Sequence, residues 1–231
     1  MRDPQRDADL DAAAVLADPV RRGLYDAVAR TGRETSRDEA AKAVHVDRSL
    51  AAFHLDKLVD AGFLEVSYRR LSGRGGPGAG RPSKLYRRSS RQLSLTLPAR
   101  RYETAARVFA TAIERSGSRS VARAVSEAAR AFGERLGEEV RALAGARPDR
   151  DKLAGATERV LAKNGFEPYR DEDAIRLRNC PFDALSSEHR ELVCGMNLAL
   201  IEGLVDASGA KSMTACFEPG EGRCCVALRK R

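Results

Sequence analysis

Apolar side chains recur at intervals of three and four residues along most of the chain, which is the spacing of one face of an α-helix. The segment 188–206 is apolar almost all round, so we expect a buried helix at the centre of a domain. The helical spacing predicts further helices over residues 11–30 (with a break near Pro19), 37–44, 47–62, 100–115, 120–144 and 149–164. A period of two predicts strands over residues 63–68, 84–88, 166–169, 175–178, 211–218 and 223–229.

Residues 36–62 carry the signals of two helices joined by a tight turn. Ser36 followed by Glu39 fits a capping box at the start of the first helix, and Asp47 is expected to cap the second. The two strands that follow are joined by a loop with five glycines between residues 71 and 82. Two helices followed by such a ribbon are typical of proteins that place one helix in a DNA groove. The apolar positions of the second helix are expected to face inward: Leu50, Ala51, Leu55, Leu58 and Val59.

Positive charge is concentrated in one part of the chain. The formal net charge is +8, and residues 66–102 contain ten Lys or Arg and no Asp or Glu. A basic segment in an otherwise near-neutral chain favours contact with a polyanion, and a solvated linker is the alternative.

The candidate DNA-binding residues lie on the second helix and on the ribbon. Arg48, Ser49 and Ala52 are expected to meet base edges, whereas Lys57 and the ribbon arginines are expected to meet phosphates or the minor groove. His54 either packs beneath the helix or touches a phosphate. The full set is Arg48, Ser49, Ala52, Phe53, His54, Lys57, Arg69, Arg70, Arg74 and Arg81.

Three motifs in this region resemble those of ArsR-type winged helix-turn-helix repressors. The run 54–64 (HLDKLVDAGFL) is similar to their recognition helix and first wing strand. The run 16–24 (LADPVRRGL) resembles the opening of that domain, and the run 80–86 (GRPSKLY) resembles the second half of its wing. The resemblance covers about residues 11–90. It implies a regulator of the repressor type whose partner is double-stranded DNA.

The predicted helices 100–115 and 120–144 are long and rich in Ala. Because Ala lets helices approach closely, either could pair with a copy of itself, and packing within the chain is the alternative. The resemblance, to a family of obligate dimers, implies a homodimer that binds a palindromic operator. We predict an α+β chain with four parts: a flexible N-terminus (1–10), a winged helix-turn-helix domain (11–92), a helical dimerisation region (93–147) and a C-terminal domain of antiparallel hairpins around a buried helix (148–231).

All five cysteines lie at or beyond residue 180. A tight turn at residues 220–221 would place Cys216 opposite Cys225, which makes a disulfide switch one alternative. Three or four of the thiols could converge, and thiolates bind soft metals and iron–sulfur clusters. Cysteines that simply fill the core are the other alternative.

Three short segments around these cysteines resemble the sensor domain of Suf-type repressors of iron–sulfur cluster assembly. They are residues 179–182 (NCPF), 189–194 (HRELVC) and 223–225 (RCC). The resemblance implies that Cys180, Cys194 and Cys224 hold an iron–sulfur cluster, with Cys225 as a substitute for Cys224, and that the cluster alters DNA binding. Cys216 is additional, and Met196 and Asn197 offer alternative ligands nearby.

Other functional classes lack sequence support. The N-terminus has no apolar signal segment, and no run of about 18 apolar residues could span a membrane, so we expect a cytoplasmic protein. No nucleotide-binding, hydrolase or metalloprotease motif is present, so we predict no enzymatic activity. His189 is expected on an exposed helix surface, and a place beside the cysteine ligands is the alternative. Two alternatives to a cysteine sensor remain, a pocket for a small apolar ligand and a C-terminal enzyme fused to a DNA-binding module.

Overall fold

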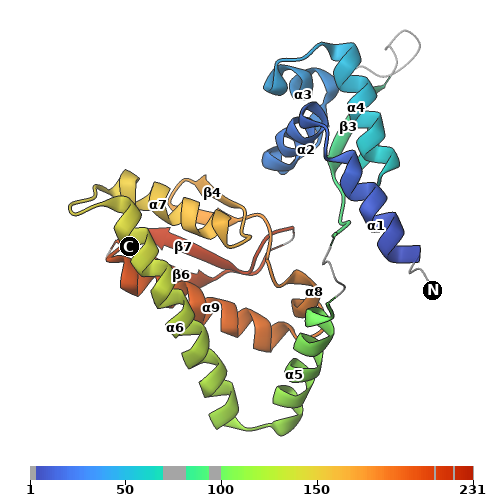
Figure 1. Cartoon of the computed structure of the whole chain (residues 1–231). Helices are drawn as coiled ribbons and strands as arrows, with labels where there is room; N and C mark the ends of the chain where they lie inside the picture. The colour runs from blue at the N-terminus through green and yellow to red at the C-terminus, as the bar shows by residue number, and fades with distance from the viewer. Residues whose placement is uncertain (1–3, 70–81, 94–99, 211, 221, 231) are drawn as a thin grey trace. The chain divides into compact units, whose positions relative to one another are not determined.

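The computed structural model describes residues 4–69, 82–93, 100–210, 212–220 and 222–230. The chain forms two compact units, Met1–Arg100 and Arg101–Arg231, each with its own hydrophobic core (Figure 1). The two helices expected to form a separate dimerisation region both belong to the second unit, where the longer one packs against the buried C-terminal helix.

The first unit is a helical domain with a small antiparallel sheet of order β1-β3-β2. The break near Pro19 and the bounds of α3 agree with the sequence prediction. Residues 4–10, part of the segment expected to be flexible, form the start of α1; Pro suits a first helical turn, and Asp9 Oδ1 lies 3.3 Å from Arg91 Nη2. Its elements are α1 (Pro4–Val15), α2 (Pro19–Thr31), β1 (Thr35–Ser36), α3 (Arg37–Val44), α4 (Arg48–Asp60), β2 (Leu64–Arg69) and β3 (Ser83–Arg88).

The second unit packs helices against a four-stranded antiparallel sheet of order β4-β5-β7-β6. The two expected hairpins therefore share one sheet, joined through β5 and β7. The expected buried helix is confirmed as α9, which lies at the centre of the core. The elements are α5 (Tyr102–Ser116), α6 (Arg119–Ala144), α7 (Arg150–Lys163), β4 (Pro168–Asp171), β5 (Ala174–Leu177), α8 (Asp183–Ser186), α9 (Arg190–Ser208), β6 (Met213–Phe217) and β7 (Val226–Lys230).

The register of the last hairpin differs from the sequence prediction by two residues. Cys216 pairs with Ala227 rather than with Cys225. The reason is that the N–H of Cys224 donates to the carbonyl of Leu177 at 3.0 Å, so the backbone at Cys224 continues the pairing with β5 instead of closing a tight turn. The disulfide switch between Cys216 and Cys225, one of the alternatives drawn from the sequence, therefore loses its geometric basis.

Helices α6 and α9 meet backbone to backbone at three glycines. A Cβ atom on Gly133 would lie 1.8 Å from the carbonyl oxygen of Leu200, and one on Gly203 would lie 2.2 Å from that of Arg130. Gly137 is equally crowded, 2.5 Å from the carbonyl oxygen of Leu204. Only hydrogen atoms fit at these positions, so α6 uses its small-residue face within the chain.

Helix α5 is held differently, through its polar side. Arg107 donates to the carbonyl of Ala184 at 3.4 Å and pairs with Glu188. His189, which was expected to be exposed, is 8% exposed and lies 2.7 Å from Glu114.

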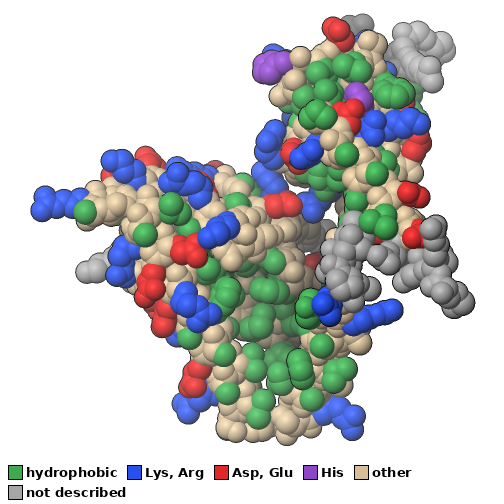
Figure 2. All heavy atoms as spheres, in the orientation of Figure 1, with side chains coloured by type: hydrophobic (Ala, Val, Ile, Leu, Met, Phe, Trp, Pro, Cys, Tyr) green, Lys and Arg blue, Asp and Glu red, His purple; other side chains and the backbone are tan. Residues whose placement is uncertain are grey.

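The apolar side of α5 faces outward. Among its residues only Ala110 is buried, whereas Tyr102, Val108 and Phe109 are 72%, 61% and 66% exposed. Figure 2 shows apolar side chains gathered over α5 and the adjoining end of α9. A helix that docks by its polar side leaves an apolar surface without an intrachain partner among the described residues.

Gly133→Ala is expected to destabilise the second unit by about 1–3 kcal/mol, because a methyl group would force the α6 and α9 backbones apart. The control is Gly195→Ala on α9, where an added Cβ meets nothing within 4 Å. Replacing this helical Gly by Ala is expected to be neutral or to stabilise by up to about 1 kcal/mol. Urea unfolding followed by circular dichroism measures both, and equal midpoints for the two variants would contradict the backbone contact.

Candidate nucleic-acid interface and cysteine cluster

The turn that leads into α4 is built by local hydrogen bonds. The capping box is confirmed, because Ser36 Oγ accepts from the N–H of Glu39 at 3.2 Å and Glu39 Oε2 accepts from the N–H of Ser36 at 2.7 Å. Hydrogen bonds lower the pKa of Glu39 to about 2. The one from the backbone N–H of Ser36 has the larger effect, and the one from the Arg33 side chain the next largest. His45 then takes a left-handed backbone conformation (φ 57°) that ends α3 and turns the chain toward Arg48.

Five of the expected DNA-binding residues share one side of α4, because positions 48, 49, 52, 53 and 57 recur on one helix face. The Arg48 and Lys57 side chains are 71% and 51% exposed, and Phe53 is 55% exposed. The opposite side carries the buried Ala51, Leu55 and Leu58, as expected from the sequence. We call the exposed side, formed by Arg48, Ser49, Ala52, Phe53 and Lys57, the α4 face.

Two further residues of α4 had stated expectations. His54 takes the first of its two expected positions, because it is only 6% exposed and its Nδ1 accepts from Arg21 Nε at 3.3 Å, so it packs beneath the helix and is not part of the α4 face. Leu50 was expected to face inward but is 41% exposed. Successive helical residues differ by about 100° in direction, and the adjacent Ala51 is the one that faces the core.

A shared carboxylate ties the second wing strand to α4. Asp56 Oδ1 accepts from the hydroxyl of Tyr86 at 3.1 Å and from Lys84 Nζ at 2.5 Å. Burial would raise the pKa of Asp56, but these two hydrogen bonds outweigh it and lower that pKa. Tyr86 itself is fully buried. The strand that follows the wing loop is therefore held at a set distance from the α4 face.

The remaining candidate residues belong to the ribbon. Arg69 ends β2 with its side chain 67% exposed. Arg70, Arg74 and Arg81 lie outside the described residues.

Comparison with known families now bears on this geometry. Residues 16–67 match a family model described as a helix-turn-helix domain, a range that contains α2, α3 and α4 and reaches into β2. The first unit contains a helix-turn-helix domain. No curated protein and no solved structure matched the chain. A helix-turn-helix domain indicates a DNA-binding regulator, and the exposed α4 occupies the position of its second helix.

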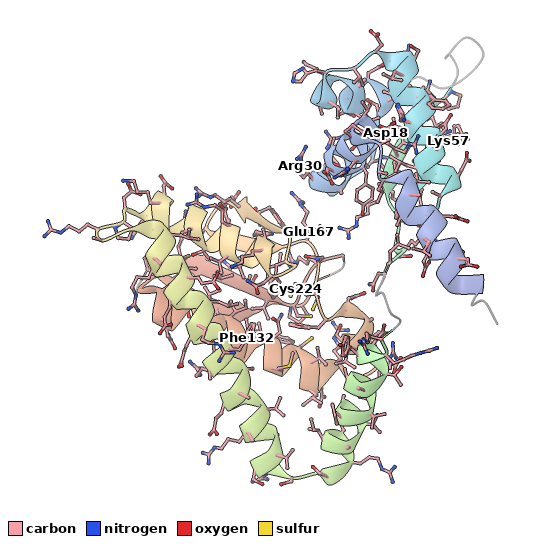
Figure 3. All side chains as sticks on the ribbon, viewed as in Figure 1. Asp18, Arg30, Lys57, Phe132, Glu167 and Cys224 are labelled. Atoms are coloured by element: carbon pink, nitrogen blue, oxygen red, sulfur yellow. The ribbon has the colours of Figure 1, made fainter. Side chains whose placement is uncertain are left out.

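Four of the five cysteines come together in the second unit. Cys180 follows β5, Cys194 lies on α9, and Cys224 and Cys225 precede β7 (Figure 3, where Cys224 is labelled). Cys180 is hydrogen-bonded to Cys224, and Cys194 to Cys225. Cys194 is also close enough to Cys180 and Cys224 for their charges to interact. Cys216 is apart, on β6, with its Sγ 3.9 Å from the carbonyl oxygen of Thr214.

The thiol of Cys224 is the one most strongly favoured as a thiolate. The hydrogen bond from Cys180 lowers the pKa of Cys224 to about 7, against the effect of burial, and correspondingly raises the pKa of Cys180. Asn197 Nδ2, 3.3 Å from Cys224 Sγ, supplies a further donor. The pKa of Cys194 is raised to about 11, mainly by burial and to a smaller extent by the hydrogen bond with Cys225. The cluster therefore favours one proton held between Cys180 and Cys224.

Two polar side chains complete the surroundings of the thiols. Asn197 is 1% exposed, and its Oδ1 has no hydrogen-bond partner among the described residues. Arg190 Nη2 lies 3.9 Å from Cys225 Sγ. Sequence reasoning did not assign a role to Arg190, because its approach to Cys225 depends on how α9 packs against the strand β7.

The described residues contain no group of three or more His, Cys, Asp or Glu side chains arranged to hold a metal ion. The four thiols lie as two hydrogen-bonded pairs. Their chemistry suits thiolate ligation, since an amide donor lies beside the buried Cys224 and a cation beside the half-buried Cys225. Among all the residues that the structure describes, no helix is long and apolar enough to cross a lipid bilayer.

Proposed function

We propose that the chain is a transcriptional repressor that binds double-stranded DNA through α4 and responds to redox or iron–sulfur status through its cysteine cluster. The observation that carries the DNA-binding part is the exposed α4 face within a matched helix-turn-helix domain. Arg48, Ser49 and Ala52 would meet base edges in the major groove. Lys57, Arg69, Arg70, Arg74 and Arg81 would meet phosphates, which positions the domain without selecting a sequence.

Arg48→Ala is expected to weaken binding to the preferred duplex by about 1–3 kcal/mol, or about 5- to 150-fold, because a base contact is lost. The probe is a duplex enriched by the wild-type protein from a random library, with affinity measured by fluorescence anisotropy at one fixed salt concentration. Arg30→Ala is the matched control, since Arg30 is exposed on α2 and lies on a different side of the unit from Lys57 (Figure 3). Equal losses in the two variants would remove α4 from the interface.

The proposed repressor is a homodimer that joins through α5 and binds a palindromic operator. Support comes from the apolar side of α5, where Tyr102, Ala105, Phe109 and Ile113 follow helical spacing. A specific interface buries about 800 Å² on each partner, more than one short helix offers, so the start of α6 is expected to take part. Two DNA-binding domains related by a two-fold axis match an operator with the same symmetry.

Phe109→Glu is expected to convert the protein to a monomer, because the charge would be buried at the centre of the α5 contact. Size-exclusion chromatography with light scattering measures the change. Thr104→Glu is the control, since Thr104 is exposed on the same helix outside the apolar positions. A wild-type monomer, or a Phe109→Glu variant that stays dimeric, would exclude this interface.

The proposed sensor residues are Cys180, Cys194, Cys224 and Cys225. They would hold an iron–sulfur cluster, while Asn197 and Arg190 donate hydrogen bonds to the thiolate sulfurs. A bound cluster would supply a redox-dependent charge and a set of bonds that ties three elements of the unit together. The support for this proposal is the two neighbouring thiol pairs, Cys180 with Cys224 and Cys194 with Cys225, and the donors beside them.

Protein purified without oxygen is expected to contain iron and sulfide and to absorb visible light. Cys180→Ala and Cys224→Ala should lose both, since each removes a ligand. Cys216→Ala is the matched control and should keep them, because Cys216 lies apart on β6. Colourless wild-type protein would instead favour structural cysteines beside a pocket for a small apolar ligand.

A further inference from the structure

The first residue of α4 is paired with a carboxylate of the preceding helix. Arg48 Nε lies 2.7 Å from Asp38 Oδ1, across the turn made by His45. Both side chains are largely exposed, at 71% and 67%, so the pair adds little to the stability of the domain. What the ion pair affects is the orientation of the Arg48 guanidinium group.

Asp38 is available for this contact because its neighbours take the other tasks of the α3 N-terminus. Ser36 and Glu39 form the capping box, and Asp38 takes no part in it. The first turn of a helix also favours a negative side chain, and Asp38 lies in the first turn of α3. An ion pair from that fixed point restricts where the long Arg48 side chain can lie.

The contact uses only one edge of the guanidinium group. Asp38 engages Nε, and no described residue accepts from the two Nη groups of Arg48. Two donors on a planar fork match the O6 and N7 acceptors of guanine, which is the commonest base contact of Arg in the major groove. The N-terminal residues of the second helix are those that reach base edges in this motif.

We propose that Asp38 is a positioning residue: by holding Nε of Arg48, it orients the two Nη groups so that they can donate to a guanine base. The inference rests on the proposed function and deepens it, because it names the base and the residue that sets the preference. Lys57 and Asp60 provide a contrast on the same helix, since they lie 4.0 Å apart and a lysine has no fork to orient. Asp60 therefore carries a similar charge near α4 without a base-reading partner.

The experiment uses the full-length chain and the duplex that the wild-type protein enriches from a random library. Each base pair is replaced in turn, and affinity is measured for the wild type, Asp38→Asn, Arg48→Lys and Asp60→Asn. The wild type is expected to lose at least about fivefold in affinity when one particular guanine is replaced. Asp38→Asn and Arg48→Lys should both reduce that penalty to less than about twofold at the same position.

The control separates orientation from charge. Asp60→Asn should shift affinity for every duplex by a similar factor and keep the guanine preference, because it removes only a repulsive charge. The inference is overturned if Asp38→Asn behaves as Asp60→Asn does, or if Arg48→Lys keeps the preference. Enrichment of specific sequences with either result leaves DNA binding standing. Failure of the wild type to enrich any sequence would overturn the proposed function and this inference together.

Discussion

The close contact between α6 and α9 sets the arrangement of the second unit. Gly133, Gly137 and Gly203 let two helix backbones meet where any side chain would collide with a carbonyl group. One side of α9 packs against α6 and the other packs against the sheet, so the surface of α9 is apolar almost all round. Cys194 and Asn197 lie on this same helix and meet Cys225 and Cys224 near the strand β7. The spacing of the thiols therefore depends on how α9 packs against the segments beside β5 and β7.

In the first unit, polar contacts fix how α4 and β3 are arranged. Asp56 accepts hydrogen bonds from Tyr86 and Lys84, which joins α4 to β3 at a point between the core and the exposed face. Buried apolar residues such as Leu55 and Leu58 determine which side of α4 points inward. The carboxylate adds a directional restraint that apolar packing lacks, because a hydrogen bond weakens steeply when its angle changes. Helix and wing strand thus keep one relative orientation.

Features with a local cause could be predicted from the sequence. The capping box of Ser36 and Glu39 located the start of α3, and helical spacing separated the α4 face from the buried Leu55 and Leu58. The even apolar distribution of 188–206 likewise indicated a buried helix. These signals depend on neighbours within one or two turns, so they survive without knowledge of the rest of the fold.

Features with a distant cause could not be predicted in this way. The buried position of His189 depends on Glu114, and the register of β6 on β7 depends on a hydrogen bond from Cys224 to Leu177. The sequence does not show which helix backbone packs against the glycines of α6. In the cysteine cluster, the convergence of thiols was foreseen as one possibility, but the pairing of Cys180 with Cys224 follows only from the tertiary arrangement.

The attachment of α5 has a consequence for the order in which the second unit opens. Its contacts to the rest of the unit are mainly polar, through Arg107 and Glu114, and only Ala110 is buried. Dissolved salt screens such exposed charges but leaves the glycine contact of α6 and α9 almost unaffected. In a single protomer, amide hydrogens of α5 should therefore exchange with solvent through local fraying, well before those of α9, which need the whole core to open. Without its partner, α5 is thus less protected from solvent exchange than the helix at the centre of the core.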